Sequence, residues 1–178
     1  MVWEKDVQEL NYRKALALKM GGEKNVAKHK EKGKYTVRER IDKFLDKGSF
    51  KEIGTLVGRV KYDDDGKISS LTPAAHLIGY GNIDGRMMSF QCGDHTVRGD
   101  IQGHKRELAA RMAIEWKIPY IRLIEEPGGS VRGIEEHAKP AKQIHLPPQS
   151  LTYTMPLMYQ VPVVSAALGA VAGYAAIW

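Results

Sequence analysis

Cysteine is nearly absent from this sequence, with Cys92 the only one in 178 residues. A single cysteine excludes an intrachain disulfide and any zinc site built from several thiolates, so nothing here points to an oxidising compartment. A secretory signal is also missing, because the first ten residues carry acidic side chains and no apolar run. We therefore expect a cytoplasmic protein.

Side-chain arrangements that support acid–base or metal chemistry are equally scarce. The sequence shows no convincing Ser/His/Asp or Cys/His order of a nucleophilic triad. Residues 63–65 form an acidic triplet that resembles half of a calcium loop, but no glutamate stands at the spacing that such a loop requires. We expect no metal in this chain, whereas backbone N–H donors are abundant.

Negative charge is in the minority, which leaves a net charge of +6 and a pI of about 9.3. Much of the positive excess lies in residues 24–40. A basic stretch can bind a phosphate backbone, but this one contains a single aromatic residue, Tyr35, and no nucleic-acid motif. A solvated helix face or a patch for an anionic ligand such as coenzyme A is therefore favoured, and we expect no nucleic-acid partner.

The pattern of apolar residues divides the chain into a helical N-terminal segment, residues 1–52, and an α/β core, residues 53–178. Thr36 and Glu39 have the spacing of a capping box that opens a helix. The apolar residues that this helix is expected to bury are Val37, Ile41, Phe44 and Leu45. The other expected elements are helices at 7–20, 23–33, 103–117 and about 149–159, a strand within 54–62, a hairpin of 76–83 with 87–92, and buried strands at 118–125 and 161–168.

A glycine-bearing turn follows each of the two buried strands, at residues 127–133 and 168–173. Glycine permits a positive φ and lets a ligand approach the main chain closely. The alternation of strands and helices implies parallel pairing, and ligands bind at the carboxyl ends of parallel strands, where both turns are expected. Two such turns can aim backbone N–H groups at a single developing oxyanion.

The uncharged run at residues 161–178 leaves a membrane-spanning helix as an alternative. Gly169 and Gly173 match the GxxxG packing motif of such helices. However, the run is short, contains Pro162 and begins with β-branched residues. We favour a buried strand followed by a buried helix, and expect no membrane contact.

Five segments follow a known family pattern in order. Residues 35–52 resemble the signature ARERIDxLLDxGSFxE, residues 93–99 resemble NDxTVxGG, and the helix that ends at residues 117–119 resembles ARxxELAxxxxIP. The two turns resemble SGGAR and GPxAGG. Together, over about residues 12–178, the chain resembles the N-terminal portion of carboxyltransferase (β) subunits of biotin-dependent acyl-CoA carboxylases of the propionyl-CoA type, and of related acyl-CoA decarboxylases.

This resemblance implies an α/β fold, the incomplete N-terminal half of a crotonase-like (ClpP/crotonase) β-β-α spiral that binds acyl-CoA. The thioester carbonyl would lie between the two turns, where backbone N–H groups stabilise the enolate formed when the α-proton leaves. The residues that the resemblance assigns to this catalytic role are Gly128, Gly129, Ser130, Ala172 and Gly173. Those assigned to acyl-CoA binding are Arg98, Lys105, Arg106, Arg132 and Tyr174, although a surface helix would carry charges such as Lys105 and Arg106 in any case.

The chain departs from the family pattern around both turns. Pro127 replaces a small residue, and Ser130 replaces an alanine without removing a backbone donor. Tyr174 stands where a second glycine is common and could narrow the acyl pocket. Glu125 and Glu126 precede the first turn where the family often has Asp-Ser, and we favour a surface or structural role for them over a role of either carboxylate in catalysis.

The resemblance also implies a biotin-dependent reaction, in which carboxybiotin on a separate carrier domain supplies the carboxyl group. Family members have two crotonase-like halves, and the biotin-side half is not part of this sequence. We therefore expect a companion carboxyltransferase chain, a biotin carrier or biotin carboxylase subunit, and a hetero- and homo-oligomer. A non-catalytic assembly subunit, a fragment of such a complex and the carboxyltransferase subunit of an acyl-CoA decarboxylase remain open as alternatives.

Overall fold

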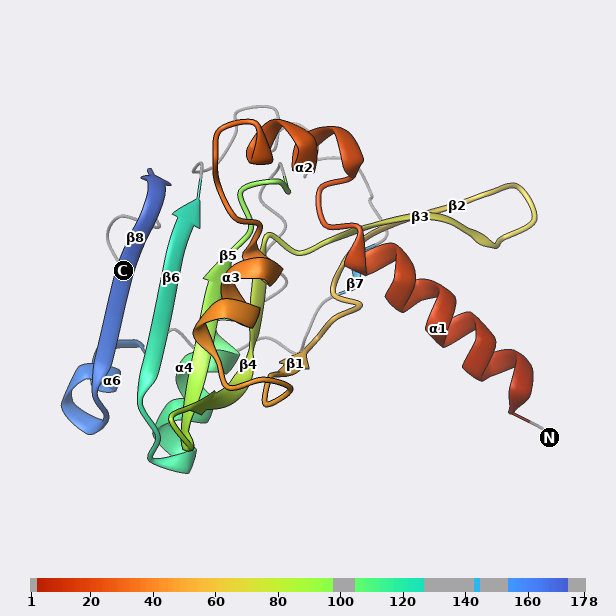
Figure 1. Ribbon diagram of the computed structural model, residues 1–178. Helices are drawn as coiled ribbons and strands as arrows, with labels where there is room; N and C mark the ends of the chain where they lie inside the picture. Colours follow the sequence, from red (N-terminus) through yellow and green to blue (C-terminus); the bar gives the residue numbers. More distant parts are fainter. Residues whose placement is uncertain (1–2, 98–104, 127–142, 145–153, 173–178) are drawn as a thin grey trace.

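A five-stranded mixed sheet forms the centre of the computed structural model, which describes residues 3–97, 105–126, 143–144 and 154–172. The strand order is β1-β4-β5-β6-β8 (Figure 1). β4 is antiparallel to β1 and β5, whereas β6 is parallel to both β5 and β8. The strands are β1 (Lys51–Ile53), β4 (His76–Ile83), β5 (Arg86–Gly93), β6 (Tyr120–Glu126) and β8 (Val163–Val171).

A smaller sheet has the order β3-β2-β7 and is built on the hairpin of β2 (Gly58–Tyr62) and β3 (Ile68–Pro73). Its third strand, β7 (Gln143–Ile144), pairs with the start of β2. The first helix, α1 (Glu4–Leu18), runs out beside this hairpin, away from the larger sheet (Figure 1). Ala17 of α1 joins Val60, Ile68 and Leu71 in a small apolar cluster that fixes the helix to the hairpin.

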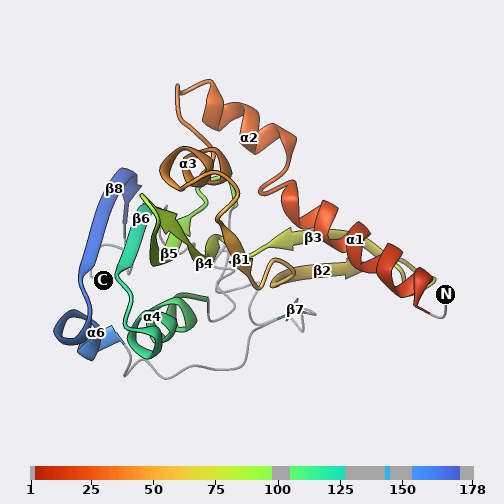
Figure 2. The same ribbon diagram turned by 60° about the horizontal axis from the view of Figure 1, so that its bottom comes forward.

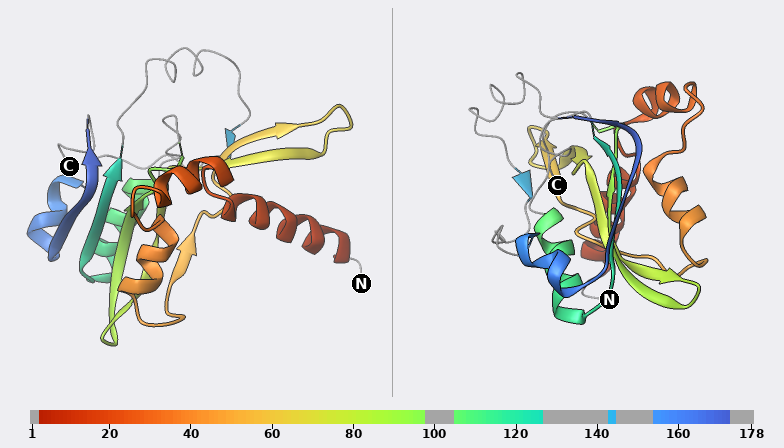
Figure 3. Two further views of the ribbon diagram at one scale, coloured as in Figure 1. Left: turned by 45° about the horizontal axis from the view of Figure 1, so that its top comes forward. Right: turned by 90° about the vertical axis from the view of Figure 1, so that its left-hand side faces the viewer.

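Helices cover both faces of the large sheet. α2 (Glu23–Lys30) and α3 (Val37–Phe44) lie on one face, and α4 (Lys105–Trp116) and α6 (Thr154–Gln160) lie on the other (Figures 2 and 3). On the first face, the core cluster unites residues of α3, β5 and β6, among them Val37, Ile41, Phe90 and Leu123. On the second, Ala109 and Ala113 of α4 pack with Ile78 and Tyr120. The N-terminal segment is thus packed directly on the core.

Local sequence signals predicted several of these elements correctly. The Thr36 hydroxyl accepts a hydrogen bond from the Glu39 N–H at 3.3 Å, and the Glu39 carboxylate accepts one from the Thr36 N–H at 2.8 Å, which confirms the capping box. The β4–β5 hairpin turns at Asp84 and Gly85, whose φ angles of 49° and 75° match a type I′ turn. Phe44 is an exception, since it is 43% exposed at the end of α3 and contacts Phe90 only edge-on.

The expected second buried strand is wrong in its burial and in its end. β8 extends to Val171, so residues 168–171 belong to the strand and not to a turn. β8 is an edge strand of the sheet, and Val164 and Leu168 are 56% and 42% exposed. β6, the strand inside it, is buried along its whole length as expected.

Residues 163–171 form a strand, which rules out the alternative of one membrane helix over residues 161–178. Over the described parts of the chain, no helix combines the length and apolarity needed to cross a bilayer.

Candidate functional site

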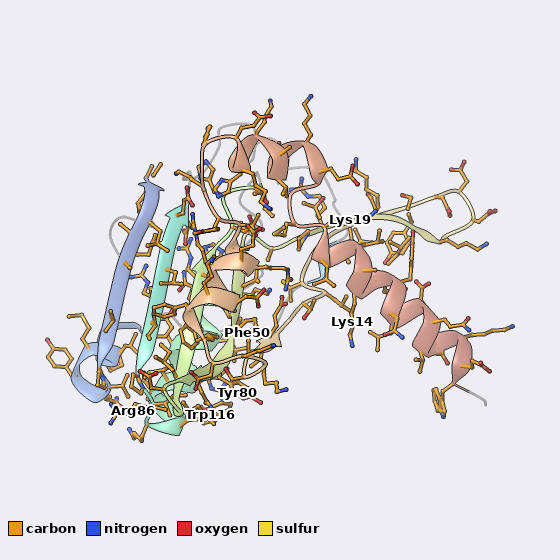
Figure 4. The ribbon with its side chains drawn as sticks, in the orientation of Figure 1. Lys14, Lys19, Phe50, Tyr80, Arg86 and Trp116 are labelled. Carbon is orange, nitrogen blue, oxygen red and sulfur yellow. The ribbon has the colours of Figure 1, made fainter. Side chains whose placement is uncertain are left out.

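The carboxyl ends of β6 and β8 lie side by side at the same end of the sheet because the two strands are neighbours and parallel (Figure 1). Glu126 pairs with Val171 at this end, and the Ala172 N–H donates a hydrogen bond to the Glu126 carbonyl oxygen at 3.2 Å. The glycine segment 127–133 follows β6 directly in the sequence, and Gly173 follows Ala172. Toward the opposite end of the sheet, Tyr80 and Trp116 meet with their ring centroids 5.2 Å apart (Figure 4).

Most of the site residues expected from the sequence lie outside the described residues. These are Arg98, Gly128, Gly129, Ser130, Arg132, Gly173 and Tyr174. Of the three that are described, Ala172 has its N–H engaged with Glu126 and cannot offer it to a ligand in this arrangement.

Lys105 and Arg106 start α4 and point into the protein, so the expectation of a charged surface at this part of the helix is wrong. Lys105 is 1% exposed, and its Nζ lies 3.9 Å from an oxygen of Glu52. Burial lowers the pKa of Lys105 to about 8, although the Glu52 charge opposes this shift. Arg106 is 7% exposed, with its Nη2 lying 2.7 Å from Glu126. Both side chains are engaged with carboxylates inside the fold.

Glu125 is a fully buried carboxylate at the end of β6, 0% exposed. Lys34 donates to its Oε1 and Arg40 to its Oε2, and the Nε2 of His29 lies 3.7 Å from Oε2. Burial by itself would raise the pKa of Glu125, but the hydrogen bonds from Lys34 and Arg40 outweigh burial and lower the pKa below its ordinary value. Glu125 is therefore not a surface residue, and its ion pairs are those expected of a structural role.

Glu126 has its own partners, from β4 and α4. The Nε2 of His76 lies 2.8 Å from Oε1 of Glu126, and Arg106 lies against Oε2. Nε of Arg106 also donates a hydrogen bond to Nε2 of His76 at 3.2 Å, so this ring nitrogen lies between a guanidinium group and a carboxylate. Burial by itself would raise the pKa of Glu126. The His76 hydrogen bond and the neighbouring positive charges outweigh burial, so the pKa is lowered below its ordinary value. Burial lowers the pKa of His76.

Two glycines make room for this pair of carboxylates. A Cβ placed on Gly169 of β8 would lie 2.3 Å from Oε1 of Glu125, and one on Gly93 of β5 would lie 2.8 Å from Cγ of Glu126. Neither distance is compatible with a real side chain, so the glutamates occupy the space that these glycines leave open. The sequence offered one signal of this arrangement, two acids at the end of an apolar strand, but the cations that neutralise Glu125 lie 85 and 91 positions away.

The segment that resembles NDxTVxGG orders the end of β5 beside this site. Asp94 is 2% exposed, and its Oδ1 accepts hydrogen bonds from the N–H and hydroxyl of Thr96 at 2.9 and 2.6 Å. The ring of His95 faces that of His29, with centroids 5.9 Å apart. Among the described residues, no group of His, Cys, Asp and Glu side chains is suited to hold a metal ion.

At the ends of two parallel strands, the structure therefore brings together Glu125 and Glu126, the basic side chains that pair with them, and the glycines that leave room for them. Comparison with known proteins identifies the family of this chain. The family model for the carboxyl transferase domain matches residues 28–176. The chain belongs to this carboxyl transferase family. The propionyl-CoA carboxylase carboxyltransferase subunit of Haloferax mediterranei is 32% identical over 136 residues, which cover 74% of this chain and 26% of that protein.

Two further matches carry the same domain. The methylmalonyl-CoA decarboxylase subunit alpha of Veillonella parvula is 31% identical over 129 residues, which cover 70% of this chain and 25% of that protein. The solved transcarboxylase 12S structure, a hexamer with methylmalonyl-coenzyme A bound, matches with a TM-score of 0.62 at 27% identity, over 76% of this chain and 28% of that chain. The α/β fold is thus a partial crotonase-like carboxyltransferase domain, as the sequence predicted, and this carboxyl transferase chain spans about a quarter of the length of the curated relatives it matches.

Proposed function

We propose that this carboxyl transferase chain forms the acyl-CoA side of a biotin-dependent acyl-CoA carboxylase. In this role it would help to move a carboxyl group from carboxybiotin to the α-carbon of an acyl-CoA. The observation that supports the proposal most directly is the meeting of β6 and β8 as parallel neighbours, each directly followed in the sequence by a glycine-bearing segment. In open α/β sheets, such paired strand ends are where ligands bind.

The chemistry that we assign to this chain is stabilisation of an enolate by backbone donors. When the α-proton leaves, negative charge develops on the thioester oxygen. N–H groups of Gly128, Gly129 and Ser130 would donate to that oxygen from one side, and the N–H of Gly173 from the other. We assign the second donor to Gly173 because the Ala172 N–H is bonded to Glu126. Removal of a single donor from such a site typically lowers kcat by about 100- to 1,000-fold.

Recognition of coenzyme A and the acyl chain belongs to other residues. We propose Arg98 and Arg132 as contacts to the phosphates and Tyr174 as a wall of the acyl pocket. Lys105 and Arg106 are assigned a supporting role beneath the site, since both are buried against carboxylates.

The complete reaction requires partners. Biotin on a carrier domain of another subunit would supply the carboxyl group. A companion carboxyltransferase chain would hold the biotin side, within a cytoplasmic hetero- and homo-oligomer. We propose that this companion covers β8, whose exposed face includes Val164 and Leu168 and which forms one edge of the large sheet.

A second candidate function is the carboxyltransferase step of an acyl-CoA decarboxylase, which runs the same exchange in the other direction. The similarity to a methylmalonyl-CoA decarboxylase subunit favours keeping this candidate. Both functions use the same acyl-CoA site and differ in the enzyme that receives or supplies the carboxyl group.

The test is carboxyl exchange by the native complex purified with this chain. Labelled methylmalonyl-CoA is incubated with free biotin, and transfer of the labelled carboxyl group is measured. We expect transfer by the wild type, and a loss on the order of 100-fold or more in Gly129→Val and Gly173→Val, because these side chains would displace the donors. Ser69→Val, on an exposed strand position of the hairpin, is the control and should keep full activity. Unchanged exchange in both glycine variants would contradict the proposal and favour a non-catalytic assembly subunit.

A further inference from the structure

We propose that Glu125 is a positioning residue, through which the N-terminal helical segment fixes the ends of β6 and β8 relative to each other. This inference rests on the proposed function, because its consequence is the geometry of the acyl-CoA site at these two strand ends. It assigns a role in that site to residues 34–40, which a reading of the sequence alone gives to a solvated face or an anion-binding patch.

The connection to the N-terminal segment consists of two charged contacts to one buried group. Lys34, just before α3, and Arg40, within α3, each donate to a different oxygen of the Glu125 carboxylate. His29 of α2 is 5% exposed and lies against the same carboxylate, and its Nε2–H donates a hydrogen bond to the Tyr35 carbonyl oxygen at 3.0 Å. Since α3 is itself anchored in the core by Val37 and Ile41, these cations hold Glu125 from a rigid base.

The connection to β8 passes through Gly169. The Glu125 side chain occupies the space beside this glycine, where a Cβ would lie 2.3 Å from Oε1. At the next residue, the Glu126 carbonyl accepts the Ala172 N–H. The ladder also shifts register between Ile124 and Glu126, which means that regular pairing alone does not set the relation of the two strands at this point. Glu125 lies within that irregularity and makes the side-chain contact across it.

The opposite face of the strand end is held in an analogous way. Successive side chains of a strand point to opposite faces, so Glu126 meets β4 and α4 through His76 and Arg106. The last two residues of β6 are thus held from both faces, by Lys34 and Arg40 at Glu125 and by Arg106 and His76 at Glu126. Replacement of a buried ion pair by apolar residues often leaves stability unchanged or improved. A purely stabilising role therefore does not require charge here, whereas a fixed orientation of the strand ends benefits from directional hydrogen bonds.

The experiment measures how strongly the bound substrate is polarised. Propionyl-CoA labelled with carbon-13 at the thioester carbonyl is bound to the native complex, and its carbonyl stretch is recorded by isotope-edited infrared difference spectroscopy. We expect a lower frequency in the wild-type complex than in free propionyl-CoA, because aligned donors weaken the C=O bond. In Glu125→Gln the frequency should return most of the way to the value of free propionyl-CoA. Carboxyl exchange should fall on the order of 10- to 100-fold, because misaligned donors stabilise the transition state less well.

Controls separate this role from a general loss of structure. Glu115→Gln removes a carboxylate from an exposed pair with Arg111, and should change neither frequency nor exchange. Gly169→Ala should act through Glu125, so the effects of Glu125→Gln and Gly169→Ala should be far from additive in the double variant. If Glu125→Gln does not fold, Lys34→Gln takes its place under the same criteria, because the Lys34 side chain is 33% exposed and Arg40 remains to neutralise the carboxylate.

The outcomes distinguish the inference from the proposed function. If the wild-type complex leaves the carbonyl frequency unshifted, the proposed function fails. If the wild type lowers the frequency and the variants at Glu125, Lys34 and Gly169 lower it equally, the proposed function stands and the positioning role of Glu125 is overturned. A reduced shift in these variants with a normal shift in Glu115→Gln supports the inference.

Discussion

Lys105 is the residue whose buried charge has the weakest compensation among the groups described above. Its Nζ is 3.9 Å from Glu52, and Glu52 already accepts a hydrogen bond from Arg38 at 2.9 Å. Among the residues that the structure describes, the ammonium group has thus exchanged water for a single distant partner that it shares with Arg38. This is why burial, and not its partner, dominates the pKa of Lys105 and lowers it to about 8.

We expect Lys105→Met to raise the free energy of unfolding at pH 7 by about 1 to 3 kcal/mol, since Glu52 keeps Arg38 when the ammonium is removed. In the wild type, the unfolded chain holds the proton up to a pKa of 10.5 and the folded chain releases it near 8. Stability should therefore rise with pH between these values, and this rise should be smaller in the variant. Urea unfolding from pH 7 to 10.5 measures both effects.

Lys14→Met provides the matched control, because Lys14 lies exposed on α1 (Figure 4) and its loss should leave both the stability and its pH dependence unchanged. A Lys105→Met variant that is markedly less stable than wild type at pH 7 would contradict the account of Lys105 as a poorly compensated charge.

At the scale of elements, α3 depends on signals that are close together in the sequence. Its capping box joins residues three positions apart, and Lys30 binds Glu39 at 2.7 Å, which with the Thr36 N–H lowers the pKa of Glu39 to about 2. The helix also positions Arg40, which donates a hydrogen bond to the carboxylate of Glu125. A local defect at the start of α3 is therefore expected to reach the end of β6.

Thr36→Ala should lower the free energy of unfolding by about 0.5 to 2 kcal/mol, the usual cost of losing an N-terminal cap. The Thr36 hydroxyl accepts the hydrogen bond of the Glu39 N–H, and because Thr36 is 3% exposed, water has little access to replace it in the variant. Ser69→Ala, which removes an exposed hydroxyl from β3, should have little effect. Chemical denaturation of the two variants side by side checks this, and equal midpoints for Thr36→Ala and wild type would argue against a stabilising cap.

Whether a feature depends on near or on distant residues in the sequence explains which elements could be predicted. The β4–β5 hairpin and the start of α3 depend on neighbours in sequence, and both were predicted correctly. The exposure of β8 was missed because an apolar strand looks the same in the sequence whether it is central or at an edge. The buried positions of Lys105 and Arg106 were also missed, since their carboxylate partners lie 53 and 20 residues away and only the tertiary fold brings them together.

At the scale of the whole molecule, β8 is an edge strand of the large sheet and carries several exposed side chains. The strand contains nine residues and no charged side chain, whereas exposed edges of natural sheets are commonly protected by lysine, proline or a covering element. Leu168 of β8 and Met87 of β5 are almost equally exposed, at 42% and 43%. They offer a matched pair for testing whether the β8 face is the one that a companion chain covers.

Leu168→Lys should reduce the mass of the native complex, because a charge at this face would have to be desolvated on association. Met87→Lys, at a similarly exposed position beside the hairpin turn, should leave the mass unchanged. Native mass spectrometry of the two purified variants gives the answer, with circular dichroism to establish that both remain folded. A normal mass for Leu168→Lys would place the companion chain elsewhere.

The central claim is that the thioester of an acyl-CoA binds between the two segments that follow β6 and β8. It is tested most directly by the structure of the native complex with propionyl-CoA bound, in which the distances from the thioester oxygen to the backbone nitrogens of Gly129 and Gly173 are measured. The account predicts both distances within hydrogen-bonding range, about 2.7 to 3.2 Å. An acyl-CoA bound at another surface, or with its thioester oxygen beyond hydrogen-bonding distance of both nitrogens, would contradict it.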